Sequence, residues 1–228
     1  MQRTLHFITG QFTPHHCYLE DAEYGRALDS MVKAVSDVLV TSKDGSQVFL
    51  GRRRVHPQPD WWLVGGRARP GEMPQQAAAR NVRRELGLDV APERFEVVAS
   101  YSLVWQMRAQ APADHGTADI STVHVLTLTP EEAATVVLDD QEYRGASWFN
   151  TNDVLESDFH PALKQAVRDM EAKKAYRSLE AAVAAETDDA ALAALARDLI
   201  ALGGKASNLP IQVHSPTNDL GSYAMQEL

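Results

Sequence analysis

Residues 66–88 read GRARPGEMPQQAAARNVRRELGL, and this stretch decides the fold that the sequence predicts. Its first part is rich in glycine and is typical of a loop, whereas residues 73–86 favour a helix. Pro74 suits the first turn of that helix because it has no N–H to leave unpaired, and Gly87 suits its end. The apolar residues 61–64 before the loop predict a short strand. The expected order is therefore strand, loop, helix and loop.

The segments around this stretch alternate between strand and turn patterns. Residues 31–42 and 47–53 are rich in apolar and β-branched side chains, and a turn containing Asp44-Gly45 separates them, which predicts a β-hairpin. Three further strands are expected at residues 95–108, 119–128 and 145–149. Predicted strands before and after the helix along the chain indicate an α/β fold.

The C-terminal third has a different pattern. Apolar positions recur at near-helical spacing from Pro161 onward, and Thr187-Asp188-Asp189 is typical of a second helix start. Gly203-Gly204 would end that helix. The sequence thus divides into an irregular N-terminal arm (1–30), a main domain (31–156), C-terminal helices (157–204) and an extended tail (205–228).

Composition excludes several classes of protein. The chain has 22 Lys and Arg against 31 Asp and Glu, a net charge of −9, whereas general binding to nucleic acid or anionic membranes needs clustered positive charge. Its longest apolar runs have about 11 residues, and a membrane helix needs about 20. A single cysteine, Cys17, permits no internal disulfide, which suits a reducing compartment. We therefore expect a soluble, cytoplasmic protein that binds neither nucleic acid nor membrane.

The fixed positions of residues 66–88 follow the pattern G-x5-E-x7-R-x4-E-x-G-L. The pattern is filled by Gly66, Glu72, Arg80, Glu85, Gly87 and Leu88. It resembles the Nudix box, and the resemblance implies a Nudix-type α/β/α sandwich with a mixed sheet, here with a C-terminal helical extension. It also implies a hydrolase of small nucleoside-diphosphate compounds. Glu72 and Arg80 would brace the loop against the helix, with Gly66 and Gly87 as further structural positions.

The box departs from the usual pattern at two positions. Nudix boxes commonly carry glutamates at positions 81, 84 and 85 of this numbering, which share one helix face. This chain has Asn81, Arg84 and Glu85. One carboxylate supplies too little negative charge for several metal ions. GDP-mannose mannosyl hydrolases are a Nudix branch whose box also lacks two of these glutamates, and they place water on the anomeric carbon of a nucleotide sugar. The likeness extends beyond the box to the segments LGRR (50–53), WW (61–62), GGR (65–67) and NDVLESD (152–158).

This resemblance implies a metal site and a substrate site. A single magnesium ion, with manganese as the other candidate, would bind Glu85, the backbone carbonyl of Gly65 and Glu142. Hard oxygen ligands suit such an ion. Catalytic or substrate-binding roles fall to Arg53, Arg67, Asp37 and His115. An arginine is apt near the leaving diphosphate because negative charge accumulates on the β-phosphate oxygen when the bond breaks. An ordinary exposed loop histidine is the alternative interpretation of His115.

The general base is the main departure from that branch. The family places a histidine just after the metal-binding side chain, and this chain has Tyr143 there. Tyrosine, with an ordinary pKa of about 10, is a poor base near neutrality. Glu142, Asp140, His115 and His124 are the candidates to replace it.

Two other functions remain possible from the sequence, and a homodimer is also expected. Hydrolysis at phosphorus would need Glu72, Glu85 and Glu142 to share the metal. A catalytically weakened nucleotide binder would explain Asn81, Arg84 and Tyr143 as traces of lost catalysis. The C-terminal helices exceed a minimal Nudix domain, and we expect them to form a homodimer contact.

Overall fold

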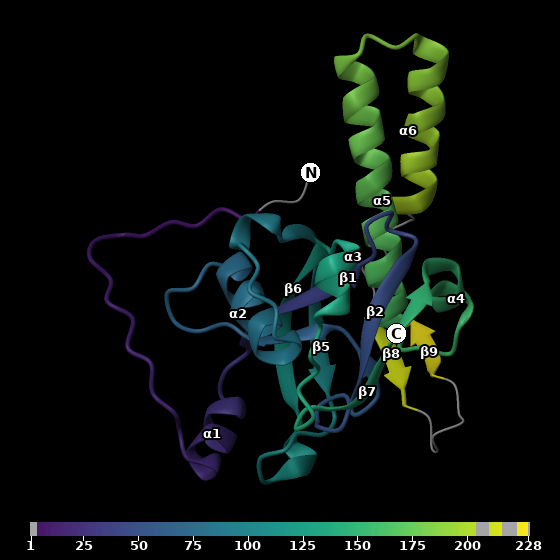
Figure 1. Ribbon diagram of the computed structural model, residues 1–228. Helices are drawn as coiled ribbons and strands as arrows, with labels where there is room; N and C mark the ends of the chain where they lie inside the picture. The colour runs from purple at the N-terminus through teal and green to yellow at the C-terminus, as the bar shows by residue number, and fades with distance from the viewer. Residues whose placement is uncertain (1–3, 204–209, 216–222, 228) are drawn as a thin grey trace. The chain divides into compact units, whose positions relative to one another are not determined.

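The computed structural model describes residues 4–203, 210–215 and 223–227 (Figure 1). The chain divides into two compact units, residues 2–150 and residues 151–228. The first unit therefore ends before the domain boundary that the sequence predicts at residue 156.

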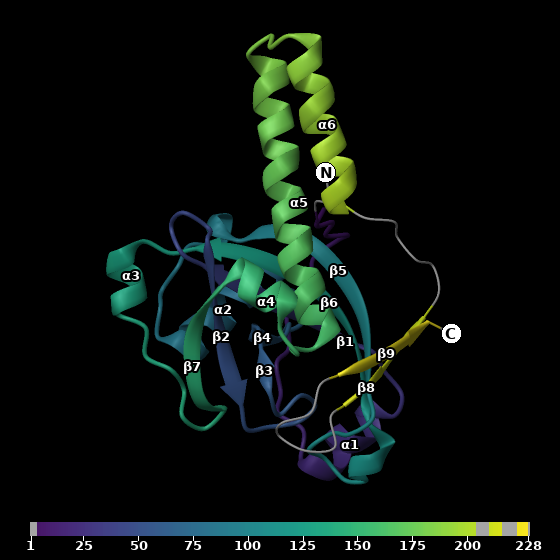
Figure 2. The same ribbon diagram turned by 90° about the vertical axis from the view of Figure 1, so that its right-hand side faces the viewer.

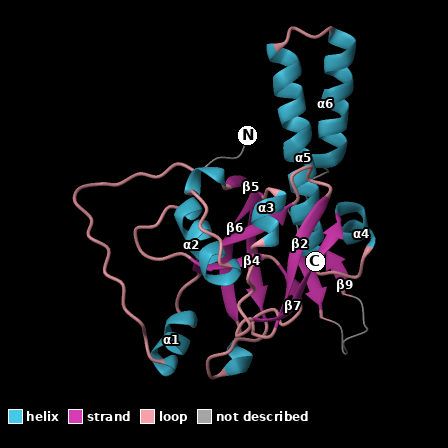
Figure 3. Ribbon diagram, viewed as in Figure 1, coloured by secondary structure: helices cyan, strands magenta, loops and turns pink. Residues whose placement is uncertain are grey.

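A mixed seven-stranded sheet forms the centre of the first unit (Figure 3). Its strands are β1 (Lys33–Thr41), β2 (Gln47–Arg53), β3 (Trp61–Trp62), β4 (Val64–Arg67), β5 (Glu96–Trp105), β6 (Thr117–Thr127) and β7 (Tyr143–Asn150). Strand β1 is parallel to β6 along one edge, while its other edge pairs antiparallel with β4 and then β2. The order is β3-β2-β1-β6-β5, with β7 paired to β2. The α/β class with a mixed sheet is confirmed.

The predicted hairpin forms from β1 and β2, with Val40 opposite Phe49. The side chain of Asp44 holds its turn, because its Oδ1 atom accepts a hydrogen bond from the amide of Ser46 at 3.0 Å. The other three predicted strands are present as β5, β6 and β7. Alternating apolar patterns therefore located the sheet correctly.

Helix α2 (Pro74–Leu86) follows β4 and its loop, as the sequence predicts. Ala78, Val82 and Leu86 are buried in one cluster with residues of the sheet. Gly87 ends the helix in the left-handed conformation, with φ of 68°, which a residue without Cβ adopts at little cost. Packing of α2 against β1 and β4 fixes the motif beside the centre of the sheet.

Several short helices are not predicted by the sequence. Helix α1 (Asp21–Leu28) lies inside the arm expected to be irregular, so that expectation is wrong for these residues, while residues 4–20 contain no helix or strand. Acidic residues in its first turn favour a helix start. Helix α3 (Pro130–Ala134) begins after Thr129, whose hydroxyl accepts the amide of Glu132. Two 3-10 helices, η1 (Pro92–Arg94) and η2 (Ala113–His115), complete the unit.

The second unit is mainly helical. It contains α4 (Thr151–Glu156), α5 (Pro161–Ala184), α6 (Asp189–Gly203), β8 (Ile211–His214) and β9 (Ala224–Glu227). Helices α5 and α6 form a long antiparallel pair (Figure 2). The amide of Ala191 donates to Asp188 Oδ1 at 3.0 Å, which caps the second helix at its predicted start. Both predicted C-terminal helices are confirmed.

The tail differs from the expected extended segment. Strands β8 and β9 form a two-stranded antiparallel sheet in which Gln212 lies opposite Gln226. The sequence did not predict this strand pairing within the expected extended tail over residues 205–228, because two four-residue runs are too short to show a clear alternation. The parts of the tail at residues 205–209, 216–222 and 228 lie outside the described residues.

Across the three described ranges, no helix is both long and apolar enough to cross a membrane.

Candidate active site

An arginine–glutamate pair joins the loop of the motif to its helix. Arg80 of α2 donates to both carboxylate oxygens of Glu72, at 2.6 and 2.8 Å, and to the carbonyl oxygen of Arg67 at 2.9 Å. The amide of Arg69 donates to the same carboxylate at 2.7 Å. Burial alone would raise the pKa of Glu72, but these donors together lower it. Both oxygens of Glu72 are thus held in the brace, so the metal-binding role that hydrolysis at phosphorus requires of it is not supported.

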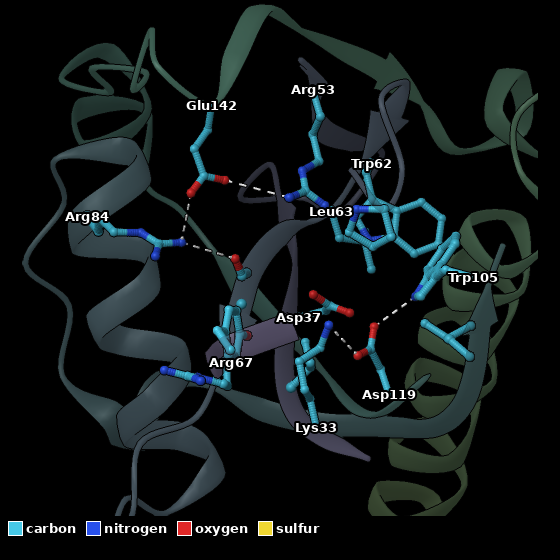
Figure 4. A pocket seen from close by; sticks show the side chains of 16 residues that line it. Lys33, Asp37, Arg53, Trp62, Leu63, Arg67, Arg84, Trp105, Asp119 and Glu142 are labelled. Atoms are coloured by element: carbon cyan, nitrogen blue, oxygen red, sulfur yellow. Dashed lines mark hydrogen bonds and ion pairs between the residues drawn. The ribbon is translucent and has the colours of Figure 1, made fainter. Parts of the chain in front are cut away.

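A cavity of about 200 Å³ lies at the start of the motif, with Gly65, Gly66 and Arg67 in its lining (Figure 4). It is lined by strands of the central sheet, by α2 and by the loop before β7. Its charged lining residues are Lys33, Asp37, Arg53, Arg67, Arg84, Asp119 and Glu142. Four of the substrate or catalytic residues expected from the sequence therefore meet at one pocket, namely Asp37, Arg53, Arg67 and Glu142.

Three arginines reach this pocket from β2, β4 and α2. Arg53 lies 3.7 Å from Glu142, and its buried Nε has no hydrogen-bond partner among the described residues. The guanidinium of Arg67 lies over the ring of Tyr24, 4.9 Å from its centroid. Arg84 Nη2 lies 3.4 Å from the same Glu142 carboxylate. Arg53 and Arg84 share Glu142 as an acidic partner, and Arg67 adds a third positive charge to this part of the pocket, which suits phosphate groups.

Asp37 lies in the middle of the pocket (Figure 4). It projects from β1 opposite Gly65 of β4, and the hydroxyl of Ser121 donates to its carboxylate at 2.6 Å. A Cβ at Gly65 would lie only 2.5 Å from Asp37 Oδ1, so glycine is needed for this close approach. Burial raises the pKa of Asp37 to about 7, against the hydrogen bond from Ser121 and the charge of Arg53. A carboxylate with such a pKa can accept a proton at neutral pH.

The two neighbouring tryptophans lie in different surroundings. Trp62 is buried in the pocket lining and meets Trp105 edge to face, with ring centroids 5.4 Å apart. Trp61 instead contacts Phe149, at 5.0 Å. Strand alternation predicts this separation of adjacent side chains. Trp62 is thus the member of the pair that lines the pocket.

A second polar group lines the pocket beside the tryptophans. The indole nitrogen of Trp105 donates to Asp119 at 2.8 Å, and Lys33 Nζ lies 3.0 Å from the other oxygen of this carboxylate. Sequence reasoning gives none of these three residues a role. The sequence around Asp119 could have indicated such a group. An acidic residue in an apolar strand pattern is expected to be buried, and a buried carboxylate needs a polar partner.

Glu85, the remaining carboxylate of the box face, is completely buried. Its Oε2 accepts hydrogen bonds from the amide of Gly65, at 3.1 Å, and from the hydroxyl of Tyr143. Its Oε1 pairs with Arg84. Burial raises the pKa of Glu85, against the charge of Arg84 and the Tyr143 hydrogen bond. Both carboxylate oxygens are therefore engaged inside the protein.

The proposed metal ligands do not fit a divalent ion in this arrangement. The Gly65 carbonyl and the carboxylates of Glu85 and Glu142 all contact one atom, Arg84 Nη2. At the position of another family glutamate, Asn81 donates to the carbonyl oxygen of Gly66 at 3.0 Å. No group of three histidine, cysteine or acidic residues within the described chain could hold a metal ion. Neither magnesium nor manganese therefore has a set of free oxygen ligands at this point.

Tyr143 lies outside the pocket lining, although the resemblance places the general base at its position. Only 2% of its surface is exposed, and its ring fills the space in which a Cβ of Gly51 would lie. Burial and the neighbouring Glu85 raise its pKa well above the ordinary value. The catalytic position that the resemblance gives to Tyr143 is therefore filled by a side chain that packs on Gly51 and donates a hydrogen bond to Glu85.

Of the four candidate replacement bases, Glu142 lines the pocket between Arg53 and Arg84. The other three lie apart from the pocket lining. His115 is an exposed loop residue whose Nδ1 lies 3.1 Å from Asp29, so the structure does not bring it to the expected substrate site. His124 is buried, and burial lowers its pKa to about 4. Asp140 is exposed and accepts a hydrogen bond from Gln141. Asp37 is the buried carboxylate that both lines the pocket and titrates near neutrality.

Comparison with solved structures finds similar chains. A MutT protein from Methanosarcina mazei Go1 is 18% identical, with a TM-score of 0.49, over 63% of this chain and 95% of that chain. A MutT NUDIX hydrolase from Burkholderia pseudomallei is 16% identical, with a TM-score of 0.49, over 61% and 98%. The dihydroneopterin triphosphate pyrophosphohydrolase of E. coli is 21% identical, with a TM-score of 0.46, over 61% and 96%.

No protein among those with curated functions matches this sequence. The family model described as NUDIX domain matches residues 31–170, which is more than half of the chain and includes the box, the seven-stranded sheet and all of the pocket lining except Tyr24. The chain therefore belongs to the Nudix hydrolase family.

Proposed function

We propose that this protein hydrolyses a nucleoside-diphosphate sugar at the anomeric C–O bond. The observation that carries this proposal is the arrangement of the pocket, with Arg67 and Arg84 on one side, Trp62 and Trp105 on the other, and Asp37 between them (Figure 4). A nucleotide sugar has matching parts, which are a diphosphate, a polar sugar and an aromatic base. The family also acts on nucleotide-type small molecules, which is consistent with this class of substrate.

The arginines would stabilise the leaving group. When water attacks the anomeric carbon, the bond from that carbon to the β-phosphate oxygen breaks, and its electron pair stays on the nucleoside diphosphate. Arg53, Arg67 and Arg84 can meet the new charge with N–H donors that are already in place. The water oxygen remains on the sugar. The products are the free sugar, the nucleoside diphosphate and one proton.

Asp37 is our candidate for the group that accepts this proton. Its carboxylate lines the pocket and is oriented by the Ser121 hydroxyl, at 2.6 Å. A base of this kind contributes about 100- to 10,000-fold to a rate when it is correctly placed. Asp119 is a poorer candidate, because Lys33 and Trp105 both contact its carboxylate.

Heavy-oxygen water tests the bond that is cleaved. The full chain is incubated with GDP-, UDP-, ADP- and dTDP-sugars in labelled water, and the products are separated by mass. We expect the label in the released sugar and unlabelled nucleoside diphosphate. Label in a phosphate product would contradict cleavage at carbon and would favour the usual attack at phosphorus.

The pH profile tests the role of Asp37. Because the ionised carboxylate is the active form, the rate should rise as pH increases through about 7 and level off above it. Asp37→Asn should reduce the rate by at least about 100-fold and remove this rise. Asp114→Asn is the matched control, since Asp114 is exposed and lies outside the pocket lining. A normal profile in Asp37→Asn would show that another group is the base.

A non-catalytic ligand binder is the second candidate. The closed cluster of Glu85, Tyr143 and Arg84 favours it, because the carboxylate that would serve catalysis in the family is fully engaged here. Such a protein would bind a nucleotide sugar and release it unchanged. Calorimetry together with product analysis distinguishes the two, and multiple turnovers that are lost in Asp37→Asn would exclude the binder.

A further inference from the structure

A cation of the protein occupies the place at which the family resemblance puts a metal. Arg84 Nη2 lies 3.4 Å from the carbonyl oxygen of Gly65 and 3.4 Å from Glu142 Oε1, and it pairs with Glu85 Oε1. These oxygens come from β4, from the loop before β7 and from α2. We propose that this guanidinium replaces the divalent metal, so that the pocket binds the diphosphate of its ligand as the metal-free anion. This inference rests on the proposed function.

A metal ion and this guanidinium cannot share the same oxygens. Magnesium binds oxygen at about 2.0–2.1 Å and needs free lone pairs directed at one point. The second oxygen of Glu85 already accepts hydrogen bonds from Gly65 and Tyr143, so it offers no alternative ligand. The positive charge of Arg84 would also repel a dication placed at this point. Metal binding would therefore require Arg84 to leave its three partners.

Arg84 keeps donors available for a ligand. A guanidinium has five N–H donors in a plane, and they match a phosphate group in pairs. The Arg84 side chain is 46% exposed and lines the pocket, whereas its partner Glu85 is fully buried. Glu85 can thus hold one edge of the guanidinium while the remaining N–H groups face an incoming phosphate.

Glu142 is the partner that a ligand would displace. Its carboxylate lies between Arg84, at 3.4 Å, and Arg53, at 3.7 Å, and its side chain is 25% exposed. These long ion pairs are weak in comparison with hydrogen-bonded ones. A diphosphate entering the pocket competes with Glu142 for both arginines. In this arrangement the Glu142 carboxylate competes with the diphosphate for the two arginines and so weakens diphosphate binding. A metal ligand at this position would instead strengthen it.

The test measures metal and nucleotide binding separately in the full chain. Electron paramagnetic resonance follows Mn²⁺ without nucleotide, and calorimetry follows GDP with EDTA or with excess Mg²⁺. We expect no specific Mn²⁺ site in the wild-type protein and the same GDP affinity in EDTA. Arg84→Ala should weaken GDP binding by about 10- to 100-fold, as expected for charged hydrogen bonds, and should allow Mn²⁺ to bind.

Two further variants keep the result interpretable if Arg84→Ala folds poorly. Glu142→Gln should tighten GDP binding by about two- to fivefold, since it removes a competing anion without changing the side-chain shape. Arg83→Ala is the matched control on the exposed face of the same helix, and it should change neither measurement. A metal ligand at Glu142 would give the reverse result, which is weaker binding in Glu142→Gln.

The outcomes separate this inference from the proposed function. Micromolar Mn²⁺ binding by the wild-type protein, or loss of GDP binding in EDTA, would overturn the replacement of the metal by Arg84. If neither the wild-type protein nor any variant bound GDP, this result would count against a nucleoside-diphosphate ligand. The Mn²⁺ spectra would still decide whether Arg84 excludes a metal.

Discussion

Helix α2 takes part in two arginine–glutamate pairs, one that ties the preceding loop to the middle of the helix and one in its last turn, and the two pairs differ in burial and in purpose. Glu72 and Arg80 are partly exposed and bridge the loop to the helix. Glu85 is fully buried next to Arg84, which reaches into the pocket. The pKa of Glu72 is lowered by its donors in spite of burial, whereas burial raises the pKa of Glu85.

This difference separates two roles of one sequence motif. The Glu72 pair maintains the path of the loop, and its residues match the family pattern. The Glu85 pair lies where the family pattern places metal-binding carboxylates, and there Arg84 changes the sign of the charge. The scaffold of a Nudix box can thus persist while the chemistry of its helix face changes.

Replacement of Glu85 should cause the largest loss of stability. Glu85→Ala removes a buried side chain and leaves the Tyr143 hydroxyl and the Gly65 amide without their acceptor, so we expect a loss of about 4 kcal/mol. Urea unfolding measured by tryptophan fluorescence reports on the first unit, because all four tryptophans lie within it. Glu85→Gln, which keeps an acceptor oxygen, should lose less. Equal losses in Glu85→Ala and Glu72→Ala would remove the contrast between the pairs.

Removal of the Tyr143 hydroxyl should have an intermediate effect. Tyr143→Phe keeps the ring beside Gly51 but deletes one donor to the buried Glu85 carboxylate, and we expect a loss of about 2 kcal/mol in the same unfolding experiment. Tyr18→Phe is the control, because the side chain of Tyr18 is 84% exposed. An unchanged stability in Tyr143→Phe would mean that the hydroxyl does not contribute to the Glu85 cluster.

The loop brace should show the smallest change. Glu72→Gln removes the charge of a partly exposed pair while keeping one acceptor for Arg80, so we expect a loss of about 1 kcal/mol. Amide hydrogen exchange should be faster at residues 66–73 and unchanged in β6. A loss as large as that of Glu85→Ala would show that the brace, rather than the buried cluster, is the stability centre of α2.

Sequence patterns could predict the elements that obey a clear period or carry a defined end. The β1–β2 hairpin, α2 and the α5–α6 pair each have such signals, including Asp44-Gly45, Gly87 and Asp188. The short helices α1, α3 and α4 and the strands β8 and β9 have too few residues to show a period. Length of the pattern therefore separates the predicted elements from the missed ones.

The site was predictable only in part, for a related reason. The resemblance led to Asp37, Arg53, Arg67 and Glu142, which all line the pocket. It could not foresee the contacts of Arg84, because these depend on three oxygens that lie on separate segments. A substitution in the box indicates that a metal-coordinating side chain is lost. Where the new side chain lies, however, depends on how the surrounding segments pack.

The contact between Gly51 and Tyr143 restricts how this site can change by mutation. The tyrosine ring occupies the volume that any side chain at position 51 would need. A larger residue at 51 is therefore tolerated only after the ring is lost, while a smaller ring at 143 leaves a gap that glycine cannot fill. Each substitution alone should therefore lower the stability of the fold, and a matched double change should restore packing. The two positions should consequently covary among relatives, and a histidine at 143 should require a compensating change at 51.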